Sequence, residues 1–142
     1  MIVYLDTSAL VKLFVQEPHS DTVIRLCEDA HIIGTSVVAF AECAAAFRRK
    51  FREKHLSSRD FDKIINKLTK EYSRFIKVSV SDELNDIIIK LLDKYPLRGF
   101  DAIHLASSLI LKSEGTLDLK FVCFDKQLNS CAEREKLDVL FS

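Results

Sequence analysis

The sequence of 142 residues contains only two prolines and three glycines, which excludes a collagen-like or linker-rich chain. No apolar run approaches the roughly 20 residues that cross a bilayer. The first six residues (MIVYLD) lack the basic region of a signal peptide. With 48% hydrophobic and 30% charged residues, the composition is typical of a globular protein. We therefore expect one domain over residues 1–142, in the cytoplasm and without a membrane partner.

The four cysteines form no C-x-x-C pair and have no histidine at zinc-site spacing. Each lies in an apolar stretch, which predicts buried free thiols rather than disulfides in a reducing compartment. They are Cys27, Cys43, Cys123 and Cys131. A glycine-rich phosphate loop is also absent, which argues against a nucleotide-dependent enzyme.

Charge is balanced overall, with 21 basic and 21 acidic residues, but it is unevenly distributed along the chain. Residues 47–77 contain eleven Lys or Arg and four Asp or Glu, a local charge of +7, and the remainder has a charge of −7. The basic segment suits a polyanion and the acidic remainder suits a cation. The alternative is that these charged helix faces are simply solvated.

Short β-branched runs alternate with longer helical patterns. Strands are predicted at residues 2–5, 31–34, 76–80, 119–124 and 137–141. Helices are predicted at residues 7–16, 21–29, 36–54, 58–75, 82–95, 100–114 and 126–136, with Ser20, Ser57 and Ser81 as N-caps. This alternation predicts a three-layer α/β/α fold with a central, mainly parallel sheet of about five strands. Sites in such folds form at the carboxyl ends of strands.

Two carboxylates directly follow predicted strands. Asp6 ends the first strand, and Asp125 closes the apolar strand at residues 119–124. Each also precedes a predicted helix, so the alternative for both is an N-cap, where aspartate is favoured.

Two further carboxylates interrupt helices that are otherwise apolar. Glu42 is the single charge within residues 37–47, and Asp101 is the one acid within residues 100–111. A helix that is apolar all round is buried, and a buried carboxylate needs a cation or a metal. The alternatives are that Glu42 faces outward or pairs with an arginine, and that the helix dipole stabilises Asp101. His104 lies on the same helix face as Asp101 and is interpreted as a core residue.

All four acids are expected to converge at one edge of the sheet. Clustered carboxylates repel one another, and a divalent cation relieves that repulsion. Ligands that are all oxygen favour Mg²⁺ or Mn²⁺ over zinc. The sequence therefore predicts an acidic metal site.

Two segments resemble the PIN domain family. Residues 5–13 (LDTSALVKL) resemble its opening motif, and residues 101–106 (DAIHLA) resemble its most recognisable helix. The resemblance covers essentially the whole chain, and the short form is similar to VapC, the toxin group of bacterial and archaeal toxin–antitoxin pairs. It implies a metal-dependent endoribonuclease that leaves 5′-phosphate and 3′-hydroxyl ends. It also implies an RNA substrate, often transfer RNA, a small antitoxin partner and a homodimer.

The resemblance assigns roles to matching positions. Asp6, Glu42, Asp101 and Asp125 take the family's acidic metal-site positions. Thr7 or Ser8 takes the position of the hydroxyl that supports the first aspartate. Many relatives have threonine two residues before the last acid, where this chain has Cys123, so the hydrogen bonding of Asp125 is expected to differ.

Basic residues are the candidates for RNA contacts. The helix at residues 58–75 places apolar side chains on one face and a stripe of cations on the other. The stripe consists of Arg59, Lys63, Lys67, Lys70 and Arg74. Arg98, close in sequence to Asp101, is the candidate for a phosphate contact at the site itself. The alternative for the stripe is a solvated helix face.

Three rival functions remain. A haloacid-dehalogenase-like phosphotransferase also uses an aspartate after the first strand, but it needs a second one where this chain has Ser8. A receiver-like domain gathers its acids on early strand ends, which Glu42 and Asp101 do not fit. A catalytically silent PIN fold that binds RNA or protein is the leading alternative.

Overall fold

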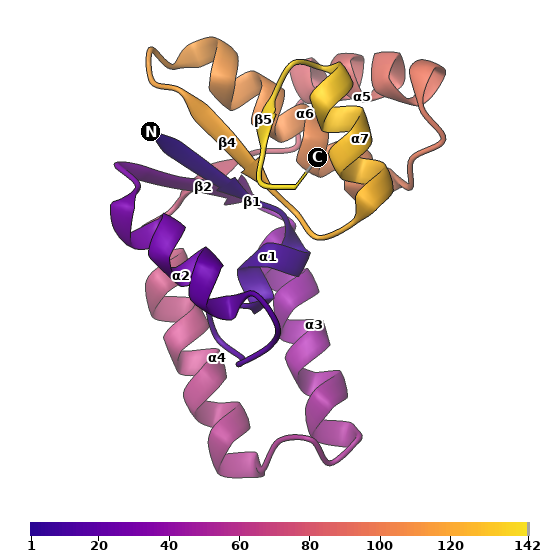
Figure 1. Cartoon of the computed structure of the whole chain (residues 1–142). Helices are drawn as coiled ribbons and strands as arrows, with labels where there is room; N and C mark the ends of the chain where they lie inside the picture. The colour runs from indigo at the N-terminus through magenta and orange to yellow at the C-terminus, as the bar shows by residue number, and fades with distance from the viewer. Residues whose placement is uncertain (142) are drawn as a thin grey trace.

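Within residues 1–141, which the structure describes, five parallel strands form the centre of the protein in the order β3-β2-β1-β4-β5 (Figure 1). The coordinates are a computed structural model. The strands are β1 (Ile2–Leu5), β2 (Ile32–Ser36), β3 (Ile76–Val78), β4 (Leu119–Val122) and β5 (Asp138–Val139). Every neighbouring pair is parallel, so the predicted sheet is confirmed and is wholly parallel.

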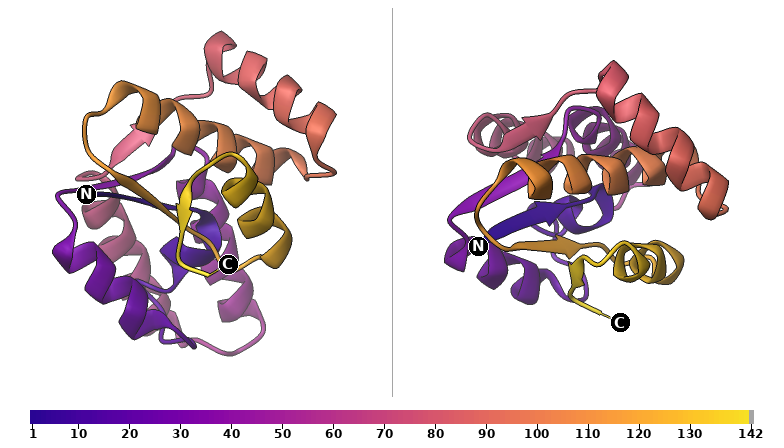
Figure 2. Two further views of the ribbon diagram at one scale, coloured as in Figure 1. Left: turned by 45° about the horizontal axis from the view of Figure 1, so that its top comes forward. Right: turned by 90° about the horizontal axis from the view of Figure 1, so that it is seen from above.

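The same described residues form seven helices that cover both faces of the sheet, which confirms the predicted α/β/α layers (Figure 2). On one face lie α1 (Thr7–Val11), α2 (Ser20–Asp29), α3 (Ala39–Arg52) and α4 (Ser58–Tyr72). On the other lie α5 (Asp82–Lys94), α6 (Gly99–Glu114) and α7 (Lys126–Arg134). None of the helices in this part of the chain is long and apolar enough to cross a membrane.

Each face of the sheet has its own hydrophobic core, because side chains alternate along a strand. Tyr4 of β1 is fully buried with Leu91 and Leu105, against α5, α6 and α7. Its neighbours in β1, Val3 and Leu5, are buried on the other side with residues of α1 to α4. The short strand β1 therefore holds the two layers together, and its carboxyl end is a well-fixed position.

Gly34 of β2 allows α6 to lie close to the sheet. A Cβ atom at this position would meet Cδ2 of Leu111 at 2.5 Å, well inside van der Waals contact. A larger residue would have to displace the Leu111 side chain, so the glycine permits this close contact between β2 and α6. Asp101 and His104 belong to the same helix.

The predicted helix at residues 7–16 is wrong in length, because α1 ends at Val11. The next three amides, of Lys12, Leu13 and Phe14, each donate to the carbonyl three residues earlier. These tighter turns end the α-helix and lead the chain toward Pro18. The prediction depended on apolar spacing alone, which does not distinguish the two kinds of turn.

The predicted N-cap of α2 is displaced by one residue. His19 is the N-cap, with φ of 72°, and Ser20 is the first helical residue. The hydroxyl of Ser20 accepts from the amide of Glu17 and donates to the carbonyl of Val15, so it stabilises the preceding loop instead. Ser57 and Ser81 are N-caps as predicted.

Several other predicted ends extend too far. The helix predicted from residue 36 begins at Ala39, because Ser36 still pairs in β2. The last strand keeps only two residues at the sheet edge, where it has a single neighbour. All four cysteines are free thiols as predicted, but Cys27 is half-buried rather than buried.

Candidate active site

Asp6 and Asp125 lie at the carboxyl ends of β1 and β4, which are neighbours in the sheet. The chain leaves β1 for β2 on one side and returns to β4 on the other, so this is the point where the strand order reverses. Open parallel sheets bind ligands at such a point. Both residues are also N-caps: Asp6 accepts from the amide of Ala9 at 3.0 Å and Asp125 from that of Leu128 at 2.8 Å.

A cavity of about 850 Å³ opens at this edge of the sheet and brings the four predicted acids together. They come from four different elements, the N-terminal ends of α1, α3, α6 and α7. The predicted supporting and phosphate-contacting residues also line it. The polar and charged lining consists of Asp6, Thr7, Ser8, Glu42, Arg98, Asp101, His104, Asp125 and Gln127.

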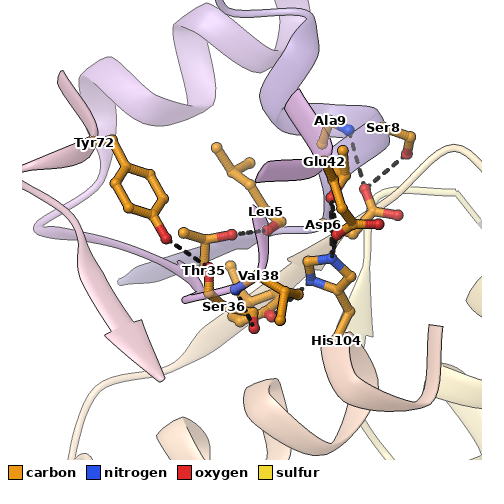
Figure 3. A network of polar contacts seen from close by, with 12 residues as sticks. Leu5, Asp6, Ser8, Ala9, Thr35, Ser36, Val38, Glu42, Tyr72 and His104 are labelled. Carbon is orange, nitrogen blue, oxygen red and sulfur yellow. Dashed lines mark hydrogen bonds and ion pairs between the residues drawn. The ribbon is translucent and has the colours of Figure 1, made fainter. Parts of the chain in front are cut away.

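Asp6 is the most deeply buried of the four acids, at 5% exposure. Its Oδ1 accepts from the hydroxyl of Ser8 at 2.7 Å as well as from Ala9, as Figure 3 shows. Burial raises the pKa of Asp6 to about 6, although His104, Ser8 and Ala9 act to lower it. The charge of Asp101 raises it further. A raised pKa means that the surroundings do not fully stabilise the negative charge of this carboxylate, so a bound cation would stabilise it.

Glu42 is half-buried, with 26% of its side chain exposed, so the expectation of full burial is wrong. Its Oε1 accepts from the Thr7 hydroxyl at 2.6 Å and lies 3.0 Å from Nε2 of His104. Its partner is thus a histidine, not an arginine. Burial alone would raise the pKa of Glu42, but the hydrogen bonds from His104 and Thr7 lower it below its ordinary value. The side chain is therefore ionised at neutral pH.

His104 is buried as interpreted, at 2% exposure, but it also lines the cavity, which the sequence reasoning missed. Its Nδ1 lies 2.9 Å from the hydroxyl oxygen of Tyr4 in the core below. Burial raises the pKa of Tyr4 well above 10, so this hydroxyl stays protonated and donates to Nδ1. Nε2 then carries the proton that Glu42 accepts. The available signal was the spacing of three residues from Asp101, which places both on one side of α6.

Asp101 lies in the first turn of α6 and is half-buried. Burial raises the pKa of Asp101, and so does the charge of Asp125, while His104 and Arg98 lower it. Arg98 is the N-cap residue of the same helix and lines the cavity. The favourable helix dipole accounts for part of the placement of Asp101, but not for its position beside three other acids.

The donor set fits a hard divalent cation, since every acidic ligand is an oxygen. Among residues 1–141, no three His, Cys, Asp or Glu side chains are close enough to enclose an ion by themselves. Mg²⁺ is usually held by one or two carboxylates and keeps several waters. The acids that line this cavity offer enough carboxylate oxygens for that mode of binding.

The basic stripe of α4 does not line the cavity. All five residues, Arg59, Lys63, Lys67, Lys70 and Arg74, are exposed as predicted. The hairpin of α3 and α4 extends away from the sheet (Figure 1). Two of the five have contacts of their own: Arg74 lies 3.7 Å from Glu71, and Lys67 lies 6.0 Å from the ring of Phe14. Of the predicted RNA-contacting residues, the structure places only Arg98 beside the acids.

Comparison with known protein families identifies the family of this chain. The family model of the PIN domain matches residues 3–133. The chain belongs to the PIN domain family. This PIN protein is also 30% identical to Ribonuclease VapC46 of Mycobacterium tuberculosis over 132 residues, which are 92% of this chain and 90% of that protein. The resemblance found in the two sequence motifs is therefore confirmed.

Solved structures show the same fold. The PIN protein aligns with VapBC2 from Rickettsia felis, bound to a promoter DNA fragment, at a TM-score of 0.68 and 14% identity, covering 98% of this chain and 97% of that one. It also aligns with VapC20 of Mycobacterium tuberculosis, a toxin that cleaves the sarcin–ricin loop, at a TM-score of 0.61 and 15% identity. That alignment covers 90% of this chain and 93% of VapC20.

Proposed function

We propose that this PIN protein is a metal-dependent endoribonuclease that hydrolyses RNA phosphodiester bonds and leaves 5′-phosphate and 3′-hydroxyl ends. It acts in the cytoplasm as the toxin of a VapBC-type pair. The observation that carries the proposal is the convergence of Asp6, Glu42, Asp101 and Asp125 on one cavity at the reversal point of the sheet. The similarity to Ribonuclease VapC46 supports the same activity.

Asp6 and Asp101 are the principal ligands for Mg²⁺ or Mn²⁺ in this proposal. Burial raises the pKa of each carboxyl most, and the negative charge of a neighbouring acid also raises it. A bound cation relieves both effects. When bound, it supplies a water of lowered pKa and stabilises negative charge at the phosphate. Asp125, the most exposed of the four, completes the acidic edge and acts through water.

Glu42 orients the attacking water and takes its proton. Both of its hydrogen bonds fall on Oε1, from Thr7 and His104, and this leaves Oε2 available for the water. Thr7 thus supports Glu42 by donating a hydrogen bond to it, and Ser8 supports Asp6 in the same way. Arg98 contacts a phosphate oxygen and offsets the repulsion between RNA and the acids. In-line attack at phosphorus then breaks the bond to the 3′ oxygen, which takes a proton from solvent water and leaves as a hydroxyl.

A small antitoxin and a second copy of this chain are the proposed protein partners. Neighbouring structures such as VapBC2 from Rickettsia felis are toxin–antitoxin complexes, which supports an antitoxin here. The substrate is RNA, with transfer RNA as the first candidate. A catalytically silent PIN fold is the alternative. The presence of all four acids in the cavity favours the active form.

The proposal is tested by calorimetric titration of Mn²⁺ into the purified protein, with RNA cleavage assayed in parallel. Asp101→Asn keeps the size of the side chain and removes its charge, so we expect it to lose metal binding and at least 100-fold in cleavage rate. Asp93→Asn, an exposed aspartate on α5, is the matched control and is expected to behave as the wild type.

Each outcome separates the alternatives. Metal-dependent cleavage that persists in Asp101→Asn contradicts the assignment of ligands. Metal binding by the wild-type protein without cleavage of any RNA, including transfer RNA, favours the silent binding module. Absence of metal binding means that the acids are helix caps and buried pairs only.

A further inference from the structure

A second cavity, of about 490 Å³, is lined in part by Phe124, the residue before Asp125. It is not part of the acidic cavity, and the proposed reaction leaves it without a role. Its lining combines three aromatic rings with a cation and an amide. These residues are His19, Phe124, Lys126, Asn129 and Phe141.

The three rings form one aromatic surface although they come from distant parts of the chain. The ring centroids of His19 and Phe124 are 5.5 Å apart, and the rings are nearly parallel at 22°. Phe141 meets both rings at steeper angles, with centroids 5.2 Å from His19 and 5.5 Å from Phe124. At 40% exposure, Phe141 is one of the more exposed large apolar side chains of the protein. Flat aromatic walls of this kind bind flat ligands by stacking.

Positive charge accompanies the rings. Nζ of Lys12 lies 4.6 Å from the centroid of the Phe124 ring, which fixes the ring from the α1 side. Lys126 is exposed at the lining of the cavity. A cation beside an aromatic surface suits a ligand that combines a flat ring with a phosphate.

Asn129 has an unpaired polar group. The residue is 5% exposed, and its amide nitrogen donates to the carbonyl of Cys123 at 3.0 Å. Its amide oxygen has no hydrogen-bond partner within the described chain. A buried acceptor without a donor is unfavourable. The oxygen is covered by neighbouring atoms, so Asn129 lines the cavity through the rest of its side chain.

The backbone of one residue that lines this cavity is hydrogen-bonded to the acidic site. The backbone N–H of Phe124 donates to Oγ of Ser8 at 3.1 Å, and Ser8 donates in turn to Asp6 at 2.7 Å. Asp125, the next residue in the chain, lines the acidic cavity. The two cavities are therefore lined by consecutive residues of one loop, Phe124 and Asp125.

We propose that this second cavity is a nucleobase subsite, which takes one base of the RNA strand beside the bond that is cut. The base stacks against the exposed rings of His19 and Phe141, which Phe124 supports from behind, and Lys126 contacts the adjoining phosphate. The inference rests on the proposed ribonuclease function and adds the substrate feature that the chain reads: a single-stranded base next to the scissile phosphate.

The conformation of His19 supports this role. With φ of 72°, the residue is in the left-handed region, which residues other than glycine seldom adopt. The side chain makes no cap hydrogen bond to α2, where Ser, Thr, Asp or Asn would be favoured. Its carbonyl accepts from the amide of Val23 at 3.1 Å, while its ring is left to the cavity.

The test measures RNA affinity without cleavage, in the Asp101→Asn background with EDTA. The probes are an eight-nucleotide single-stranded RNA and the same RNA with one base at a time replaced by an abasic ribose. We expect base removal at one position to weaken binding about tenfold, because one stacked base contributes that much. The double change His19→Asn and Phe141→Leu is expected to weaken binding of the intact RNA by a similar factor. It should also remove the dependence on that base.

The variants are chosen to keep the fold. Asparagine tolerates the left-handed conformation of position 19, and the exposed Phe141 can be shortened without opening a core. His55→Asn, at an exposed histidine with no cavity contact to these rings, is the matched control and should bind as the parent does.

Equal RNA affinity of the cavity variants and the parent overturns the subsite, as does an equal affinity for every abasic probe. Neither result touches the proposed ribonuclease function, which fails on a different measurement, the absence of Mn²⁺-dependent cleavage by the wild-type protein. If only a peptide partner binds the cavity and RNA affinity is unchanged, the proposal is likewise wrong.

Discussion

Nε2 of His104 lies 3.0 Å from Oε1 of Glu42, and this contact connects the hydrophobic core to the acidic cavity. On its other side, the imidazole is hydrogen-bonded to Tyr4 in the central strand (Figure 3 shows His104 beneath Glu42). One buried ring thus fixes the orientation of a catalytic candidate from below. The residues are 62 positions apart in the chain, so only the fold brings them together.

Replacing His104 is expected to destabilise the fold as well as the site. His104→Leu leaves the buried hydroxyl of Tyr4 without its acceptor and removes one of the two donors to Oε1 of Glu42, so we expect a loss of about 2–4 kcal/mol in unfolding free energy. Tyr4→Phe removes one hydrogen bond and leaves the ring in place, and we expect about 1 kcal/mol. Urea unfolding of the metal-free proteins at pH 7 measures both.

The exposed His55 gives the control, since His55→Leu should stay within about 0.5 kcal/mol of the wild type. If the effects of His104→Leu and Tyr4→Phe are simply additive in the double variant, the hydrogen bond between them contributes nothing and the interpretation is wrong.

The raised pKa of Asp6 predicts an unusual pH dependence of stability. In the unfolded chain this carboxyl ionises near 3.8, whereas in the folded protein its pKa is about 6. Between these values the folded state binds more protons, so stability is full below about pH 4, falls as pH rises toward 6, and is then constant. Asp6→Asn removes this loss and keeps a capping side chain. We therefore expect it to be more stable than the wild type at pH 7 by about 2 kcal/mol.

The measurement is unfolding free energy against pH, in EDTA. The difference between Asp6→Asn and wild type should vanish toward pH 4 and reach its plateau near pH 7. A wild-type protein that is more stable than Asp6→Asn throughout would mean that Asp6 is fully ionised and well paired in the folded state. Asp93→Asn, at an exposed site, should show no such difference.

The stripe on α4 is expected to contribute to RNA affinity by charge alone. Changing Lys63, Lys67 and Lys70 to glutamate should weaken binding strongly at low salt. It should also reduce the slope of log affinity against log salt by about 2, because each contact with single-stranded RNA releases roughly 0.7 of a counterion. The cleavage site should not change, since the stripe lies outside the acidic cavity.

A triple reversal of equal charge on the opposite layer provides the comparison, at the exposed Lys90, Lys112 and Lys136. If both triple variants lose the same affinity, net charge explains the effect and the stripe is only a solvated helix face. Unchanged affinity of the α4 variant removes the stripe from RNA binding.

Much of the local structure could be predicted because its causes are local. The apolar run that ends at Asp6 predicts a buried strand, and serines at positions 57 and 81 predict helix starts that the structure confirms. The helix beginning at Thr7 was predicted too long, because apolar spacing continues past Val11 while the hydrogen bonds change to the three-residue pattern. The spacing of apolar residues predicts which side chains are buried, but it does not predict whether the backbone forms α-helical or tighter turns.

The acidic cavity was predictable in outline for a related reason. Asp6 and Asp125 follow strands, and parallel strands end at the same edge of a sheet, so their convergence follows from topology alone. The pairing of Glu42 with His104 was not predictable, because a lone histidine in an apolar helix is equally typical of an ordinary core. The surroundings of Phe124 were also hidden, since His19, Phe124 and Phe141 show no common pattern along the chain.

The sequence by itself determined the alternation of strands and helices, the parallel sheet, and the four acids that interrupt or end apolar segments. These features depend on burial periodicity and on backbone hydrogen bonds between near neighbours. Tertiary structure alone decided that Tyr4, His104 and Glu42 form one chain of hydrogen bonds, that the α4 stripe does not line the acidic cavity, and that three distant rings share one cavity. Such contacts depend on how whole layers pack, and packing is set by side chains far apart in the sequence.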